Sequence, residues 1–212
     1  MESHLFFFGP PAFGLRFHAP DRERQSRVFE DDKISVDAIS LRHRTPTFGY
    51  LFREKPRLLN IRKEKIDEFG LGVADVVRVK QGEDHVMEDG RVIPNRVLTL
   101  PPYHRRSYAY ISDTVYDPSI AEQIRGVDVL FHEATFSGRD EKLALETMHS
   151  TAAQAARVAR EAGAGKLLIG HFSTRYKDHS HLVEEAREIF ENTEGVNDGD
   201  AFSIPRQRET PE

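Results

Sequence analysis

Cysteine is absent from this 212-residue chain, which excludes a disulfide framework, a thiolate metal site and a cysteine nucleophile. Also missing is any apolar run long enough to cross a membrane. The amino terminus has no basic region leading into a long apolar one. We therefore expect neither membrane insertion nor secretion, and we expect the reducing cytoplasm to be the protein's location.

Acidic residues are in modest excess, with a formal net charge of −5 at pH 7, and the charges are unevenly spread along the chain. Residues 16–65 are rich in arginine and net basic, whereas residues 178–200 are strongly acidic. A basic arm on an acidic body could meet a phosphate backbone, although charges that merely solvate a surface explain the pattern equally well. The length suits one ordinary domain with an appended arm.

Three short apolar runs organise the chain, and each ends beside a residue able to hold a metal ion. They span residues 108–112, 127–131 and 166–170. The residues that follow them are Asp113, His132, Glu133 and His171. Each run is typical of a buried strand, and the crossovers between them predict parallel neighbours. Carboxyl ends of parallel strands share one edge of a sheet, so the pattern predicts an α/β fold with a metal site at that edge.

Local signals predict the remaining elements. Further strands are expected at 5–8, 34–41, 48–52 and 202–204, and helices at 63–69, 73–80, 118–124, 139–146, 152–162 and 180–190. The helix at 152–162 has the strongest signal, because Thr151 and Gln154 form a capping box and Gly163 provides a stop. Residues 88–91 indicate a hairpin turn, and residues 206–212 are expected to fray. We expect one domain over 1–212, with 53–102 as a protruding arm.

The candidate metal ligands are His43, Asp113 and His171. Imidazole nitrogen with carboxylate oxygen is the ligand set of catalytic zinc. Each residue also has an ordinary role open to it: His43 could close a turn, Asp113 could cap a helix, and His171 could be a satisfied histidine at a strand end. No His-Glu-x-x-His or Cys-x-x-Cys signature decides between these interpretations.

A second set of candidates comprises His132, Glu133 and His149. A glutamate that is hydrogen-bonded to a histidine orients the ring and raises its basicity, which suits a general acid that protonates a leaving oxygen. The alternative is that Glu133 caps a turn and His149 packs at a helix start. Arg175, near the last apolar run, could contact phosphate or be an ordinary surface charge.

These motifs, in this order, resemble those of the ribonuclease Z family, the tRNA 3′-processing endonucleases of the metallo-β-lactamase superfamily. The matching segments are 41–43, 48–50, 112–114, 132–136, 149–151 and 170–176, with 8–10 as a further likeness. The resemblance covers nearly the whole chain. It implies a zinc-dependent endoribonuclease that hydrolyses the phosphodiester at the 3′ end of precursor tRNA.

The resemblance also implies a role for each candidate. His43 and His171 would each serve one of two zinc ions, Asp113 would bridge both, and His149 supported by Glu133 would protonate the leaving oxygen. The arm would be the family's exosite that grips tRNA. Its basic residues are Arg53, Lys55, Arg57, Arg62, Lys63 and Lys65, with Arg175 nearer the centre.

One family motif is missing: the chain contains no His-x-His-x-Asp-His, which supplies most ligands in the family. Three ligands do not hold two zinc ions in normal coordination. We therefore expect a partial metallo-β-lactamase αβ/βα sandwich that is incomplete or inactive alone, working as a homodimer or with a complementing amino-terminal half. The alternatives are a non-catalytic tRNA-binding or interaction remnant of the fold, and another phosphodiesterase of the superfamily.

Overall fold

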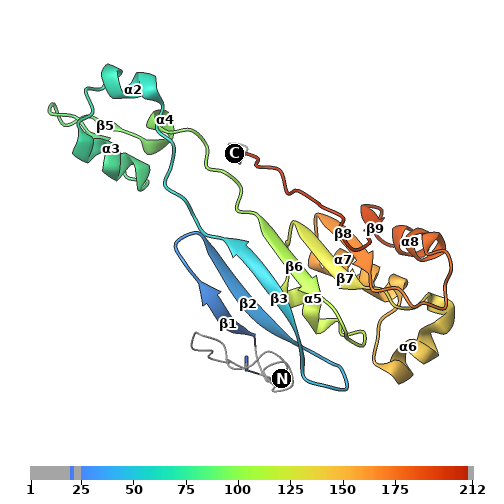
Figure 1. Cartoon of the computed structure of the whole chain (residues 1–212). Coiled ribbons are helices and arrows are strands. Elements are labelled where there is room, and N and C mark those ends of the chain that lie inside the picture. The colour runs from blue at the N-terminus through green and yellow to red at the C-terminus, as the bar shows by residue number, and fades with distance from the viewer. Residues whose placement is uncertain (1–19, 22–24, 210–212) are drawn as a thin grey trace, which may run out of the picture.

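The computed structural model describes residues 20–21 and 25–209, so the strand expected at 5–8 lies outside the described residues. Its body is one seven-stranded sheet with helices on one face (Figure 1). In spatial order the strands are β1 (Ser26–Glu30), β2 (Ile34–Leu41), β3 (Thr47–Glu54), β6 (Ser107–Ile111), β7 (Val129–Glu133), β8 (Lys166–Gly170) and β9 (Thr193–Gly195). The first four pair antiparallel, and β6 to β9 pair parallel. The α/β prediction with three parallel central strands is therefore confirmed.

The helices of the body bury the inner face of this sheet. They are α5 (Ser119–Gln123), α6 (Glu141–Thr147), α7 (Ala152–Ala162) and α8 (Ser180–Arg187), with a 3-10 turn, η1, at Gly138–Asp140. Buried strand residues such as Leu130 of β7 and Ile169 of β8 share one core with the small side chains Ala155 and Ala159 of α7, and all four are fully buried. Alanine lets a helix lie close to a sheet, so this sequence fixes α7 directly over β7 and β8.

Helix α7 begins with the capping box that the sequence predicts. The Gln154 amide donates to the Thr151 hydroxyl at 3.2 Å, and the Thr151 amide donates to the Gln154 side chain at 3.0 Å. At the other end Gly163 has φ +64°. The Thr151→Ala substitution should therefore destabilise the fold by about 1 kcal/mol, because buried helix-start N–H groups lose an acceptor. Urea unfolding midpoints check this, and Thr151→Ser, which keeps the oxygen, should stay near wild type.

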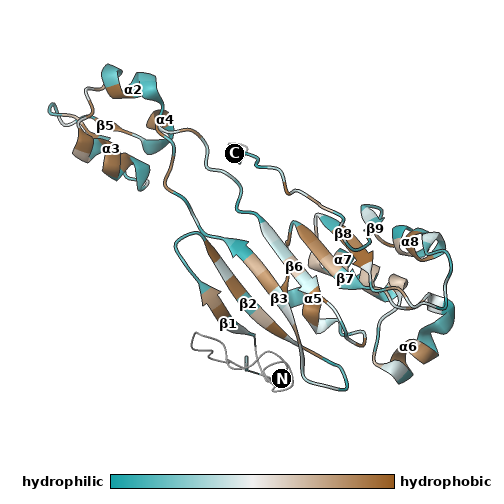
Figure 2. Cartoon of the chain, in the orientation of Figure 1, coloured by the Kyte–Doolittle hydropathy of each residue, from teal (hydrophilic) through white to brown (hydrophobic). Residues whose placement is uncertain are grey.

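The other face of the sheet carries a band of aromatic side chains that helices do not cover. Tyr110 stacks on Phe131 at 4.9 Å between ring centroids, and Phe52 stacks on Tyr108 at 5.9 Å. Tyr110 and Phe52 remain 39% and 36% exposed. In Figure 2 brown, hydrophobic positions lie in β2, β3 and β7, whereas β6 is mostly pale and many of the connecting loops are teal. The sheet therefore presents a partly open apolar face.

Residues 55–106 leave the body after β3 and return to it at β6 (Figure 1). They contain α2 (Lys63–Glu68), α3 (Val73–Lys80), β4 (His85–Val86), β5 (Val92–Ile93) and α4 (Asn95–Leu98). Leu71, Val79 and Leu98 form a separate small core. The β4–β5 hairpin turns through Gly90 at φ +84°, at the predicted position. Arg53 and Glu54, expected at the start of the arm, belong to β3, so from here on the arm means residues 55–106.

An ion pair between Glu54 and Arg106 joins the two chain segments at the base of the arm. The guanidinium lies 2.7 Å from the carboxylate, the Arg106 amide adds a bond of 3.1 Å, and Arg106 also donates to the Ile204 carbonyl at 3.1 Å. Hydrogen bonds from Arg106 outweigh partial burial and lower the pKa of Glu54 from 4.5 to about 2.

A pKa that is lower in the folded state contributes stability that is complete above pH 4.5 and is lost as the pH falls toward 2. The Glu54→Gln substitution should therefore lower the melting temperature at pH 7, with the difference from wild type shrinking between pH 4.5 and 2. Thermal unfolding across this range checks the prediction. Glu88→Gln, at an exposed arm position, is the matched control; an equal loss in both variants at pH 7 would contradict it.

Several predicted elements are corrected by the structure. Residues 202–204 do not form a strand; the edge strand is β9, earlier in the chain. The described part of the expected frayed end, residues 206–209, pairs with the arm through a bridge between Tyr103 and Arg208. Helix α8 ends three residues before the predicted position, and β7 includes His132 and Glu133 rather than stopping before them. Strand β1 was not predicted. No helix in the described part of the chain has the length and apolar character needed to cross a bilayer.

Candidate metal centre

The carboxyl ends of the parallel strands bring the candidate residues together. Ile111 pairs with His132 and Glu133 pairs with Gly170, so β6, β7 and β8 end nearly level. Asp113 lies two residues beyond β6, and His171 follows β8 directly. The shared edge that the sequence predicts is therefore present.

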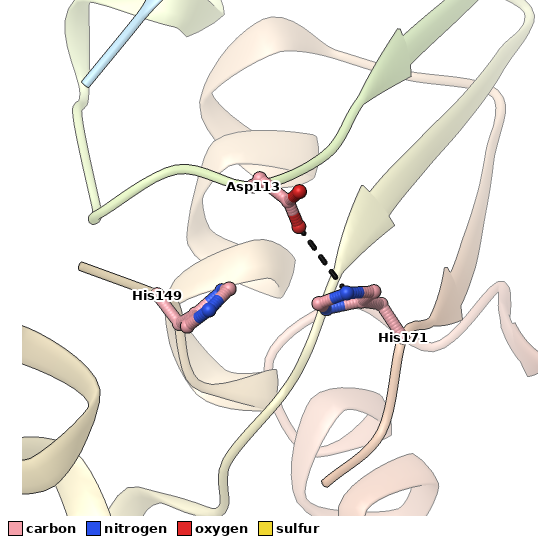
Figure 3. Close-up of side chains that lie close together, drawn as sticks. All are labelled: Asp113, His149 and His171. Carbon is pink, nitrogen blue, oxygen red and sulfur yellow. Dashed lines mark ion pairs between the residues drawn. The ribbon is translucent and has the colours of Figure 1, made fainter. Parts of the chain in front are cut away.

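Asp113, His149 and His171 form the cluster at this edge, and each offers a ligand atom within 4.8 Å of the other two (Figure 3). The Asp113 Oδ1 and His171 Nε2 atoms are 3.2 Å apart. Asp113 and His171 both have φ of +60°, a left-handed conformation that costs energy in residues other than glycine. Both strained residues point into the same cluster, a distribution typical of functional sites.

The hydrogen bonds of Thr135 fix which nitrogen of His171 carries the proton. The Thr135 hydroxyl donates to Glu133 Oε2 at 2.5 Å, so its oxygen accepts the contact from His171 Nδ1 at 2.9 Å. In the neutral ring, His171 Nε2 then presents a lone pair toward Asp113. Asp113 Oδ1 is buried and has no hydrogen-bond partner among the described residues. Two facing lone pairs repel unless a cation lies between them, so these residues fit a metal ion.

Glu133 supports the cluster from a fully buried position on β7. Its Oε1 accepts from the Thr114 amide at 2.7 Å and from His149 Nδ1 at 2.9 Å, and its Oε2 accepts from Thr135 and from the Ser150 amide at 3.3 Å. Burial raises the pKa of Glu133, but the hydrogen bonds from His149 and Thr135 outweigh it, and the net pKa lies below the usual value. The hydrogen bond to Glu133 raises the pKa of His149 in turn.

The structure places His43 beside this cluster. Its ring centroid lies 5.1 Å from that of His149, and its Nδ1 lies 2.9 Å from the Met148 carbonyl. Nδ1 therefore carries the proton and leaves Nε2 as a possible ligand atom. His149, expected as a proton donor, lies within the three-residue cluster, and His43, expected as a ligand, lies beside it.

His132 does not join the centre. Its ring is fully buried, Nδ1 donates to the Glu133 carbonyl at 2.7 Å, and Nε2 has no partner among the described residues. Burial lowers its pKa, so the ring is neutral. The other histidine pair, His179 and His181, packs on Phe172 and Tyr176 at 4.5 and 5.2 Å between centroids.

The expected RNA-binding residues are dispersed. Lys55 and Arg57 pair with Glu30 and Glu54, and Lys65 pairs with Glu68. Arg53 lies 3.8 Å from Asp37, and Arg62 donates to the Thr99 carbonyl. Lys63 is exposed at the start of α2. Arg175 lies over the Phe136 ring at 5.4 Å and near Asp140. Arg175 is thus the one nearest the cluster in sequence, four residues after His171.

Thr135 is the functional residue that sequence reasoning missed. It connects Glu133 to His171 and sets the tautomer of the histidine. A threonine two residues after a strand-end glutamate gives no distinct signal, because threonine occurs in many turns and strands.

Comparison with known proteins decides the family. The Beta-lactamase superfamily domain matches residues 34–172, which include β2 to β8 and Asp113, Glu133, His149 and His171. The chain belongs to the beta-lactamase superfamily. Two solved structures share the fold of this superfamily member: human tRNase Z, short form (TM-score 0.50, 22% identity, 85% of this chain and 47% of that chain), and the metallo-beta-lactamase fold protein YhfI from Bacillus subtilis (TM-score 0.51, 17% identity, 81% and 49%). The predicted metallo-β-lactamase fold is confirmed.

Curated relatives of this superfamily member are named ribonuclease Z. The protein from Phocaeicola vulgatus is 45% identical over 188 residues, covering 89% of this chain and 61% of the relative. Those from Bacteroides fragilis strain YCH46 and Porphyromonas gingivalis strain W83 are 47% and 46% identical, covering 89% and 88% of this chain and 62% and 61% of the relatives. The chain thus spans about three-fifths of the length of the curated relatives it matches. The predicted resemblance to ribonuclease Z is confirmed.

Proposed function

We propose that this chain belongs to a metal-dependent endoribonuclease of the ribonuclease Z type, which hydrolyses the phosphodiester at the 3′ end of precursor tRNA in the cytoplasm. One observation carries the proposal: His171 Nε2 and the orphaned Asp113 Oδ1 face each other at 3.2 Å, at the edge where the parallel strands end. Similarity to proteins named ribonuclease Z supports the choice of substrate.

In this proposal zinc is the metal, with Asp113 and His171 as ligands and His43 beside them. Zinc supplies Lewis-acid activation of a phosphodiester when bound. These residues leave open positions on even one ion, so the two ions proposed for the complete enzyme need further ligands. Thr135 orients His171, and buried Glu133 holds the ring of His149.

His149 is proposed to hold a proton at Nε2 and donate it to the leaving oxygen. Its Nδ1 is committed to Glu133 at 2.9 Å, which leaves Nε2 directed toward the cluster (Figure 3). The same position would allow His149 to be a third ligand. The two roles predict different losses, because a proton donor contributes to turnover whereas a ligand contributes to metal affinity.

The His149→Ala substitution is expected to reduce cleavage of precursor tRNA by about 100-fold or more while zinc affinity stays close to wild type. Single-turnover cleavage and a competitive zinc titration with a chromophoric chelator measure the two quantities. His181→Ala, at a histidine outside the cluster, is the matched control. A fall in zinc affinity that accounts for the lost turnover would assign His149 as a ligand instead.

The exposed aromatic face of the sheet indicates that another polypeptide chain binds there. Partly exposed, stacked rings across β3, β6 and β7 form an apolar surface of the kind that interfaces cover. We propose that a second copy or a complementing amino-terminal half covers it. Sedimentation equilibrium separates the two, because a homodimer doubles the mass whereas dependence on another chain leaves a monomer.

Cleavage assays test the function itself. With zinc and the complementing chain present, a precursor tRNA carrying a 3′ trailer should be cut to leave a 3′-hydroxyl, and a mature tRNA should not be cut. Cutting of a simple phosphodiester without preference for tRNA would point to another phosphodiesterase of the superfamily. Binding of tRNA without cleavage, even in the presence of added complementing chain, would point to a non-catalytic remnant.

A further inference from the structure

A basic groove lies at the base of the arm, away from the metal centre. It has a volume of about 1070 Å³, and six lysine and arginine side chains but only two glutamates line it. The whole chain, by contrast, carries a net charge of −5. The groove is therefore basic although the chain as a whole is acidic, and this local excess of positive charge needs a physical reason.

The carboxy-terminal segment completes the groove by pairing with the part of the arm that returns to the body. The His104 amide donates to the Gln207 carbonyl at 2.9 Å, the Glu209 amide donates to the Pro102 carbonyl at 2.8 Å, and Tyr103 bridges Arg208. This antiparallel register places Arg105 opposite Arg206. Alternate residues of extended chain share a face, so Tyr103 and these three arginines form one surface.

This arrangement of arginines is unfavourable for folding alone. Like charges directly opposite each other destabilise a strand pair. No ion pair is found for Lys80, Arg105, Arg206 or Arg208 within the described ranges 20–21 and 25–209, although the groove's Lys55 and Arg57 each have one. Charges held together without carboxylate partners are suited to an external anion.

Tyr103 adds an aromatic surface to the charges. The guanidinium carbon of Arg208 lies 4.3 Å from its ring centroid and that of Arg206 lies 5.9 Å away, while the ring remains 37% exposed. Arginines beside an aromatic ring in a charged groove are typical of surfaces that follow a nucleic-acid backbone and contact its bases.

The position of the groove favours a macromolecular ligand. Strand β6 starts beside the groove and ends beside Asp113, so the two sites lie at opposite ends of a five-residue strand. At about 3.3 Å per residue the strand alone separates them by roughly 15 Å. A ligand that reaches both must be extended, as a polymer with charges along its backbone is.

We propose that this groove binds the phosphodiester backbone of an RNA, with Lys80, Arg105, Arg206 and Arg208 as phosphate-contacting residues and Tyr103 as a stacking surface. The identity of the polyanion as RNA rests on the proposed function; the groove's affinity for phosphates does not. The site is distinct from the metal centre and uses four basic residues that lie outside the cluster expected from sequence.

RNA binding measured without cleavage tests the proposal. Fluorescence anisotropy of a labelled precursor tRNA, in chelator and over a series of salt concentrations, compares wild type with Arg105→Gln/Arg206→Gln. We expect affinity at 0.1 M salt to fall about tenfold or more. The slope of log affinity against log salt should decrease by about 2, one for each lost phosphate contact. Lys142→Gln/Arg160→Gln, two basic residues on α6 and α7, is the matched control and should match wild type.

A further variant and a further ligand keep the outcomes of this experiment separate. The Lys80 ammonium has no ion-pair partner among residues 20–21 and 25–209, so Lys80→Gln tests the groove even if the double variant folds poorly, and its slope should decrease by about 1. Unchanged affinity and slope in both groove variants would overturn the proposal. So would tight binding of tripolyphosphate by wild type without binding of the tRNA. A protein that binds tRNA through the groove but never cleaves it would contradict the proposed function and leave the groove intact.

Discussion

Replacing Asp113 with asparagine is expected to remove zinc binding at the centre and to lower precursor tRNA cleavage by more than about 100-fold. Groups that merely support metal ligands typically contribute 10- to 100-fold, so loss of a direct ligand should exceed that range. The amide is nearly the size of the carboxylate, but it lacks the negative charge that would offset a cation beside His171 Nε2. Chelator-competition titration and single-turnover cleavage measure the two effects.

The same substitution should also change the stability of the metal-free protein. Asp113 Oδ1 has no hydrogen-bond partner in the described chain, so asparagine can place its N–H₂ toward the Nε2 lone pair of His171. We therefore expect the melting temperature of the metal-free variant to equal or exceed that of the metal-free wild type. Asp198→Asn, at an exposed acidic position, should change neither metal affinity nor melting temperature. A variant that still binds zinc as wild type does would argue against Asp113 as a ligand.

Substitution of Glu133 by glutamine is expected to have the second large effect. All four partners of this buried carboxylate are hydrogen-bond donors, and a glutamine would have to direct its own N–H₂ at two of them. Thr135 can turn its hydroxyl, but the amides of Thr114 and Ser150 cannot become acceptors. Unsatisfied buried groups of this kind destabilise a fold by about 1–3 kcal/mol.

Catalysis should suffer more than folding. Without the carboxylate, His149 loses the partner that orients its ring and raises its pKa, and general acid catalysis typically contributes about 100- to 10,000-fold. We expect kcat for precursor tRNA to fall within this range while KM changes little. Urea unfolding, zinc content and the kcat–KM split separate the effects, with exposed Glu146→Gln as the control. If the loss of kcat disappeared once the folded fraction was taken into account, Glu133 would have only a structural role.

Local sequence signals predict much of the fold because interactions between residues close in sequence determine those elements. The alternation of residues 34–41 predicted β2 with the same bounds, and the capping box and Gly163 predicted both ends of α7. The short edge strands β1 and β9 carry few apolar residues, and pairing along the sheet fixes them instead. The pairing of residues 206–209 with the arm joins segments about a hundred residues apart, which no local pattern encodes.

The residues of the metal centre also fall into those that local sequence signals predict and those that depend on tertiary contacts. Strand-end position was enough to predict Asp113, Glu133 and His171, since parallel strands bring their ends to one edge. The Phe136 amide donates to the Ser150 carbonyl at 3.3 Å, and the Ala152 amide donates to the Phe136 carbonyl at 2.9 Å. These bonds hold the loop that carries His149 at this edge, so its entry into the cluster depends on tertiary contacts. Thr135 acts through two side-chain bonds that only the assembled site reveals.

Anomalous diffraction at the zinc absorption edge, from crystals of the chain grown with zinc, tests most directly whether Asp113 and His171 hold a metal ion. We expect one strong peak about 2.0–2.2 Å from an Asp113 carboxylate oxygen and from His171 Nε2. Zinc elsewhere on the molecule, with Asp113 and His171 in direct contact and no peak between them, would contradict it.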